Sequence, residues 1–290
     1  MANAPPKTWT IGSLVKWATD DFRARGIENP RLDAELIVAH ALGIDRMRVI
    51  LDAERPLDER ELSTLRDLVK RRRAYEPIAY LRGEREFYGL RFRVDKRVLV
   101  PRPDTETLVD VALARTARVS LSMRMLDLCT GSGCVAIAIA RQRPTSAVFA
   151  TDVSPDAIAV ARENALRLGA YNVAFEEADL FAAKMIQGVR FDVVTANPPY
   201  IASGEIETLQ PDVRDHEPRL ALDGGADGLD LVRRIVAEAP EHLAPGGALA
   251  MEVGAGEAAA TVELFEARGF REIRVDRDIA RIERVVSGLV

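Results

Sequence analysis

The stretch MRMLDLCTGSGCVAIAIARQR, residues 123–143, indicates the class of fold. The segment MRMLDL is typical of a strand, and CVAIAIARQR is typical of a helix that Pro144 ends. Between them, Gly131 and Gly133 let the backbone pass close to a ligand that faces the N–H groups of the helix. The alternative is a tight turn without a ligand. A P-loop is excluded because no lysine follows the glycines.

Strands and helices continue to alternate after this unit. A helix capped by Ser154, with Pro155 at its first position, extends to Gly169, and another is expected over residues 228–243. The further expected strands are AVFATD (147–152), VAFEEAD (173–179), FDVVTAN (191–197), ALAMEVG (248–254) and two within the tail 270–290. This alternation predicts an α/β domain with a mostly parallel sheet.

The first eighty or so residues have a different pattern. Apolar side chains recur at helical spacing, for example at Leu14, Ala18 and Phe22, which predicts a small helical bundle. The following stretch EFYGLRFRVDKRVLVPRP alternates apolar and polar residues around Gly89 and predicts a β-hairpin. We therefore expect a helical substrate-docking domain over residues 1–85, a hairpin linker over 86–104 and an α/β domain over 105–290.

The composition limits the classes of function. The 290 residues are 48% hydrophobic and 29% charged, with a net charge of −5, which argues against a broad surface for duplex DNA. The run KRRR at 70–73 is either a local basic patch or, as we favour, a solvated helix end.

Location and metal content follow from other features of the composition. No apolar run approaches the roughly 20 residues of a membrane span, and the start MANAPPKTWT lacks the apolar segment of a secretory signal. We expect a cytoplasmic protein without membrane association. Cys129 and Cys134 are too few for a disulfide framework, and no metal is expected.

Polar side chains stand at the ends of four expected strands. Asp152 lies 19 positions after Gly133, where a carboxylate can accept both ribose hydroxyls of a nucleoside, and Asp179 is placed to accept from an adenine amino group. Asp127 and Asn197 end two further strands. All four converge on the carboxyl edge of one sheet, where open α/β sheets bind ligands.

The residues after the strand at 191–197 are unusual. In VVTANPPYIAS, residues 193–203, Pro198 and Pro199 cannot donate hydrogen bonds to a sheet, so the strand must stop there. Asn197 therefore stands at a strand tip, followed by two rigid residues and Tyr200.

These motifs together resemble the class I methyltransferases that use S-adenosylmethionine and act on planar amide or amino nitrogens. The resemblance rests on the DxxTGSG loop, the acids that end the next two strands, and NPPY. It implies a seven-stranded, Rossmann-like sheet, with S-adenosylhomocysteine as the cofactor product. NPPY also occurs in adenine-N6 methyltransferases of nucleic acids, so it specifies the nitrogen chemistry and leaves the macromolecule open.

Other segments resemble the protein-(glutamine-N5) methyltransferases that modify peptide chain release factors. The similar segments are residues 76–108, which include VPRPDTE, residues 212–235 and the closing RIERVVSGL. Cys129 stands where the release-factor enzymes usually carry glycine, and DLCTGSGC is the spelling of a sister enzyme that methylates a ribosomal protein. EVGAGE, residues 252–257, also lacks the glutamine common after that strand.

The resemblance implies a role for each site residue. The Asn197 side-chain oxygen and the Pro198 carbonyl accept both amide protons of the substrate glutamine, Pro199 keeps the segment rigid, and Tyr200 packs on the amide plane. The residues implied to bind the cofactor are Cys129, Thr130, Gly131, Ser132, Gly133, Asp152, Asp179, Leu180 and Asn197.

Further expectations concern the segment PRPDTE and the partner. PRPDTE, residues 101–106, is expected to fold over the site, with Thr105 or Glu106 as candidates to touch substrate, and Arg284 is expected to brace the last strands. The implied partner is the GGQ loop of a release factor, bound by a monomer without sequence-specific contact to nucleic acid. The alternatives are a ribosomal protein as substrate, an adenine-N6 methyltransferase of nucleic acid, and a non-catalytic cofactor-binding module.

Overall fold

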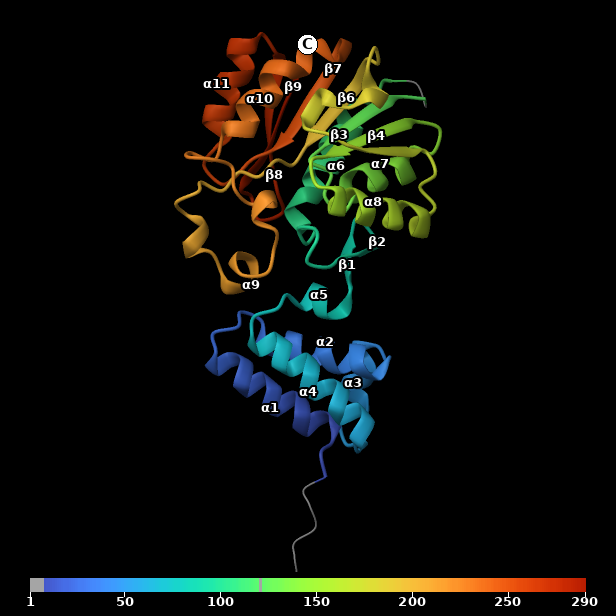
Figure 1. The fold of residues 1–290 in the computed structure, drawn as a ribbon, viewed down its shortest axis with the longest axis vertical. Coiled ribbons are helices and arrows are strands. Elements are labelled where there is room, and N and C mark those ends of the chain that lie inside the picture. Colours follow the sequence, from blue (N-terminus) through green and yellow to red (C-terminus); the bar gives the residue numbers. More distant parts are fainter. Residues whose placement is uncertain (1–7, 120–121) are drawn as a thin grey trace, which may run out of the picture. The chain divides into compact units, whose positions relative to one another are not determined.

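The computed structural model describes residues 8–119 and 122–290 and divides the chain into two compact units. One unit runs through Gly83 and takes in the separate segment Gln210–His216. The other comprises Glu84–Leu209 and Glu217–Val290 (Figure 1). The opening MANAPPK, on which the expectation about a secretory signal partly rests, lies outside the described residues. Among the described residues, no helix is long and apolar enough to cross a bilayer.

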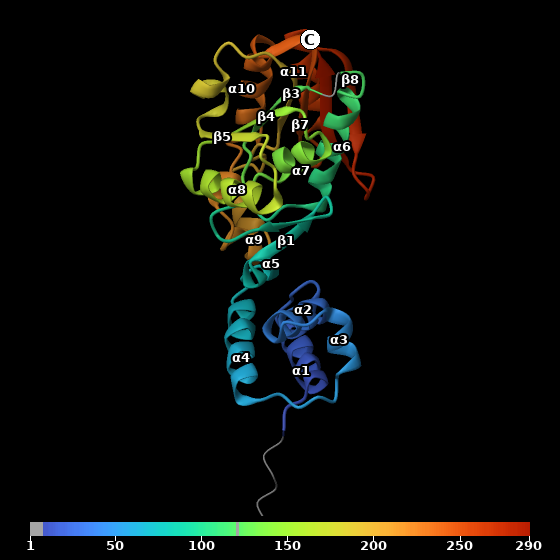
Figure 2. The same ribbon diagram turned by 90° about the vertical axis from the view of Figure 1, so that its right-hand side faces the viewer.

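The first unit consists of short helices around its own apolar core (Figure 2). Thr10 and Asp58 begin two of them with capping boxes, in which side chain and backbone exchange hydrogen bonds. Phe22, Ile37 and Leu65 are fully buried in the core. The helices are α1 (Ile11–Ala24), α2 (Pro30–Leu42), α3 (Arg46–Leu51), α4 (Glu59–Arg73), α5 (Ile78–Arg82) and α9 (Pro211–Arg214).

The basic run at the end of α4 meets the expectation of a solvated helix end at Lys70 and Arg73, which are exposed, but not at Arg72. Arg72 is buried, and its Nε donates to Asp33 Oδ2 at 2.8 Å. Its Nη1 donates to the carbonyls of Tyr75 and Glu76 just beyond the helix. Arg72 therefore closes the helix end from inside the unit, because a guanidinium can bind a carboxylate and free carbonyls at once.

The second unit contains the predicted seven-stranded sheet, which is confirmed. The strand order is β5-β4-β3-β6-β7-β9-β8; β9 runs antiparallel to both of its neighbours, and the other pairs are parallel. The strands are β3 (Arg124–Leu128), β4 (Ala147–Asp152), β5 (Val173–Glu177), β6 (Phe191–Ala196), β7 (Leu243–Glu252), β8 (Arg271–Arg277) and β9 (Glu283–Leu289). β7 begins five residues earlier than the expected ALAMEVG segment.

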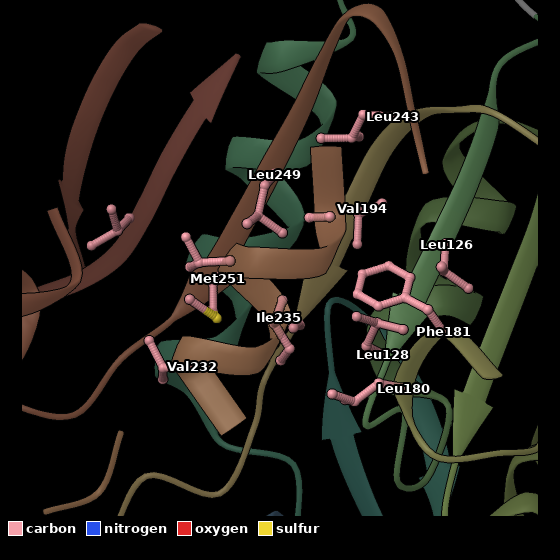
Figure 3. Close-up of a cluster of buried hydrophobic side chains, with 14 of the residues drawn as sticks. Leu126, Leu128, Leu180, Phe181, Val194, Val232, Ile235, Leu243, Leu249 and Met251 are labelled. Carbon is pink, nitrogen blue, oxygen red and sulfur yellow. The ribbon is translucent and has the colours of Figure 1, made fainter. Parts of the chain in front are cut away.

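Helices cover both faces of this sheet (Figure 1). On one face α10 and α11 pack over alternate strand residues, including Leu126, Leu128 and Val194, in one buried apolar cluster (Figure 3). The two helices on this face are α10 (Asp230–Glu238) and α11 (Ala258–Arg268). The other face is covered by α6 (Glu106–Arg115), α7 (Cys134–Gln142) and α8 (Pro155–Leu168). The chain leaves β3 toward β4 and β5 on one side and returns to β6 on the other, which places a ligand crevice at the carboxyl ends of β3 and β6.

The hairpin belongs to the same unit as the sheet, which differs from the expected separate linker. Its strands are β1 (Glu84–Phe87) and β2 (Leu90–Arg93). The fully buried Asn164 of α8 holds β2, because its side chain accepts from Arg93 N at 2.7 Å and donates to Arg93 O at 3.0 Å. At the turn, Tyr88 N donates to Glu106 Oε1 at 2.8 Å. These bonds to α8 and α6 explain why the unit boundary falls at Gly83, before the hairpin.

Candidate active site

A pocket lies at the carboxyl ends of the parallel strands, as the topology requires. Its wall includes most of the residues that the sequence predicted for the cofactor. The predicted residues that line it are Cys129, Thr130, Gly131, Ser132, Asp152, Asp179, Leu180, Asn197 and Pro199. Gly133, Pro198 and Tyr200 are not part of this wall. Gly133 supports the loop from behind, while Pro198 and Tyr200 belong to the segment that continues from Asn197.

Asp127 anchors the start of the glycine loop. Its carboxylate is buried and accepts from Thr130 Oγ1 at 2.6 Å and from Thr195 Oγ1 at 2.7 Å. Burial raises its pKa to about 6, and the two hydroxyl bonds oppose that rise. Asp127 thus ties the loop after β3 to β6, the strand that leads directly into Asn197.

Asp152 closes the loop from the end of β4. Gly131 N donates to its Oδ2 at 2.8 Å, and Ser154 N donates to its Oδ1 at 2.9 Å. Burial raises its pKa. Each carboxylate oxygen can accept more than one hydrogen bond, so Asp152 can still receive hydroxyl groups from the pocket.

The glycines of the loop differ in what they permit. Gly131 has a φ of +54°, and a Cβ there would meet no atom within 4 Å, so a ligand can approach its backbone. Gly133 has a φ of +80°, and a Cβ there would lie 2.9 Å from Ile137 Cδ1 and 3.1 Å from Ala161 Cβ.

We expect Gly133→Ala to lower the free energy of unfolding by about 2–3 kcal/mol, since strain and a steric clash coincide. The matched variant Gly131→Ala meets only the strain, so it should cost about 1 kcal/mol. Urea unfolding of both variants measures the difference. Equal losses of stability would show that α7 and α8 do not pack tightly behind the loop.

Asp179 and Leu180 follow β5 at the pocket. Leu180 is buried with a φ of +50°, and Thr151 Oγ1 donates to its carbonyl at 3.1 Å. Asp179 is exposed, and its Oδ2 accepts from Arg234 Nη2 at 2.8 Å. The sequence motifs give no sign of this ion pair, because Arg234 lies 55 positions further along the chain.

The NPPY segment is held by the loop that precedes α10. Ile201 N donates to Leu222 O, and Gly224 N donates back to Ile201 O. A Cβ on Gly224 would lie 2.8 Å from both Pro199 O and Tyr200 Cα, so only glycine lets the two segments lie this close. The sequence DGGADG, residues 223–228, thus supports the NPPY segment.

The segment 97–105 forms another wall of the pocket, a contribution the sequence indicated only through PRPDTE. Arg97, Pro101, Arg102 and Thr105 line the pocket. Arg102 Nη2 donates to the buried Glu217 Oε1 at 2.6 Å, which fixes the segment to the chain beyond NPPY. Apolar lining from Pro218, Leu220, Ala221 and Leu231 had no sequence signal, because nothing in the motif order places them there.

The chemistry of the lining suits a nucleoside cofactor that carries a positive charge. Three carboxylates line the pocket, and both arginines of the wall are already paired, Arg97 with Asp95 and Arg102 with Glu217. Acceptors for hydroxyl groups therefore coexist with apolar surface for a purine ring. The residues present fit S-adenosylmethionine.

The chain resembles known proteins along nearly its whole length. A family model described as the PrmC N-terminal domain matches residues 13–83, and one described as a methyltransferase domain matches residues 120–261. A release factor glutamine methyltransferase of Geobacter sulfurreducens is 43% identical over 285 residues, with 98% of each chain covered. One of Caulobacter vibrioides is 38% identical, with 98% of this chain and 95% of that chain covered.

A solved structure shares the fold. The hMettl16 catalytic domain, solved with a MAT2A 3'UTR hairpin, has a TM-score of 0.57 at 14% identity. The match covers 77% of this chain and 81% of that chain.

Proposed function

Since the chain belongs to the family of release factor glutamine methyltransferases, we propose that its pocket binds S-adenosylmethionine and that NPPY presents a release-factor glutamine to it. The observation that carries this proposal is the meeting of three segments in one pocket. Gly131, Asp152 and Asn197 lie at the ends of different strands, yet all line the same wall. The chain is accordingly a protein-glutamine methyltransferase.

The proposed cofactor contacts follow the lining. Thr130 to Ser132 hold the methionine portion, with Gly133 behind them. Asp152 accepts the ribose hydroxyls, and Asp179 with Leu180 holds the adenine. In this proposal the Arg234 ion pair keeps the Asp179 carboxylate at the pocket rim. S-adenosylmethionine, when bound, supplies a methyl group attached to a positively charged sulfur.

The protein's own part in the reaction is to orient the amide. A glutamine nitrogen is a weak nucleophile because its lone pair is delocalised into the carbonyl. Asn197 Oδ1 and the Pro198 carbonyl accept its two N–H groups, so the nitrogen is held toward the methyl group without a strong base. Tyr200 packs on the amide plane, and the proton released after transfer passes to water.

The partner is proposed to be the GGQ loop of a release factor, docked through the helical unit. A single glutamine offers too little surface for selectivity, so a second contact region is needed. A monomeric enzyme in the cytoplasm is part of the same proposal.

A substrate comparison tests this function. The enzyme is incubated with methyl-labelled S-adenosylmethionine and, separately, a release factor, ribosomal proteins, DNA and RNA. We expect label in the release factor alone. Label in a ribosomal protein instead would transfer the assignment to the sister enzyme suggested by DLCTGSGC, and label in nucleic acid would refute protein methylation.

A further inference from the structure

We propose that Thr105 and Glu252 are positioning residues that fix which atom of the Asn197 side-chain amide faces the substrate. The inference deepens the proposed function and rests on it. Neither residue follows from the cofactor motifs: Thr105 precedes α6, and Glu252 ends β7.

The contacts form a chain that starts at the pocket. Asn197 Nδ2 donates to Thr105 Oγ1 at 3.3 Å. The Thr105 hydroxyl is close enough to the Glu252 carboxylate to lower the pKa of Glu252. Thr105 is 2% exposed and Glu252 is 1% exposed, so water does not compete with these contacts.

The order of donors and acceptors in this chain has one solution when Glu252 is ionised. A carboxylate only accepts, so the Thr105 hydroxyl directs its single proton toward the negative charge of Glu252. Its oxygen is then left to accept from Asn197, which must present Nδ2 to it. Asn197 Oδ1 consequently faces away from Thr105 and remains free to accept an N–H of the substrate amide.

The surroundings of the Glu252 carboxylate are unusual for a residue with a purely structural role. Its Oε2 is buried and has no hydrogen-bond partner among the described residues. In the described part of the chain, four charged or titratable groups face Glu252: Arg284, Tyr200, Asp104 and Cys134. Arg284 itself forms ion pairs with Asp278 and Asp104. Tyr200 OH is 3.5 Å from Glu252 Oε1. A buried carboxylate oxygen without a hydrogen bond lowers the stability of the fold. A role in positioning Asn197 explains why such a carboxylate is present at this place.

Burial raises the pKa of Glu252 to about 7, while the Thr105 hydroxyl and the positive charge of Arg284 oppose that rise. A protonated Glu252 can donate to Thr105, whose hydroxyl can then donate to Asn197 Oδ1 and turn the amide around. Transfer should therefore decline as the pH falls through about 7.

Stability should change in the opposite direction. The folded pKa lies above the ordinary value of 4.5, so the folded state holds the proton more tightly and loses stability as the pH rises from 4.5 to 7.

The first test replaces Thr105. Thr105→Val keeps the shape and removes the hydroxyl, and we expect kcat to fall about 10-fold or more, with S-adenosylmethionine affinity within about 2-fold of the wild-type value. Thr105→Ser keeps the hydroxyl and should recover most of the lost rate. Thr261→Val is the matched control, because Thr261 is also buried and its hydroxyl has no partner in the described structure. Equal kcat for Thr105→Val and the wild-type enzyme would overturn the proposal.

The second test replaces Glu252. Glu252→Gln is neutral and can donate or accept, so we expect a lower kcat at pH 8 and loss of the decline near pH 7. We also expect a midpoint of thermal unfolding about 2–4 °C higher than that of the wild-type enzyme at pH 8, because the buried charge is gone. A lower midpoint with an unchanged pH profile would show that Glu252 is structural, and so contradict the proposal.

The outcomes separate this inference from the proposed function. If the wild-type enzyme methylates no release factor, the proposed function fails before any variant is compared. If it methylates the release factor and the variants do so equally well, only the Thr105 and Glu252 inference fails.

Discussion

Asn197→Ala is expected to lower the rate of methyl transfer by about 10²–10³-fold, the usual effect of removing one preorganised hydrogen-bonding group from a reaction centre. The loss should appear in kcat. Asn197 directly follows β6 at the pocket wall, where its proposed role is to accept from the substrate amide. Single-turnover transfer of a labelled methyl group, with calorimetric measurement of cofactor binding, checks both quantities. Cofactor affinity should stay within about 3-fold of wild type.

A matched control separates loss of the acceptor from general damage. Asn29→Ala makes the same chemical change at an exposed residue, whose side chain makes no cap hydrogen bond at the start of α2. It should leave transfer unchanged. Substantial turnover by Asn197→Ala would refute the assignment of Asn197 as an acceptor in the reaction.

Asp152→Ala is expected to weaken S-adenosylmethionine binding by about 10²-fold. Two effects combine: the proposed hydrogen bonds to the ribose are lost, and Gly131 N and Ser154 N lose their acceptor. Calorimetric titration with S-adenosylmethionine measures the change. KM for the cofactor should rise, while the rate at saturating cofactor should fall far less.

Asp156→Ala is the control for Asp152. Asp156 is an exposed acid in the first turn of α8, four positions further along the chain. Its removal should change cofactor affinity by less than about 2-fold. Similar losses in both variants would mean that general negative charge, rather than the hydrogen bonds of Asp152, holds the cofactor.

The α/β architecture could be predicted because its signals are local. Each strand and helix carries its own apolar period, and α8 also carries its own cap at Ser154, whose side chain accepts from Ala157 N as expected. Strand ends in a parallel sheet converge by topology alone, so Asp152 and Asn197 could be placed in one pocket without coordinates.

The rest depends on contacts between distant residues, which leave no periodic trace in the sequence. Asn164 binds the hairpin across 71 positions, and the ion pair of Arg234 spans 55. The segment Gln210–His216 belongs to the helical unit although it follows the sheet strand β6. Its Asp212 lies 3.8 Å from the buried Arg72, a pairing that the charge pattern of either segment alone could not reveal.

The most direct test of the central claim is to locate the transferred methyl group. Release factor is methylated by the enzyme with labelled S-adenosylmethionine, digested and sequenced by tandem mass spectrometry. We predict a single methyl on the side-chain nitrogen of the glutamine in the GGQ loop, formed about 10²–10³-fold more slowly when Asn197→Ala is used. A methyl on another residue, or the same methyl formed at an unchanged rate by Asn197→Ala, would contradict the account.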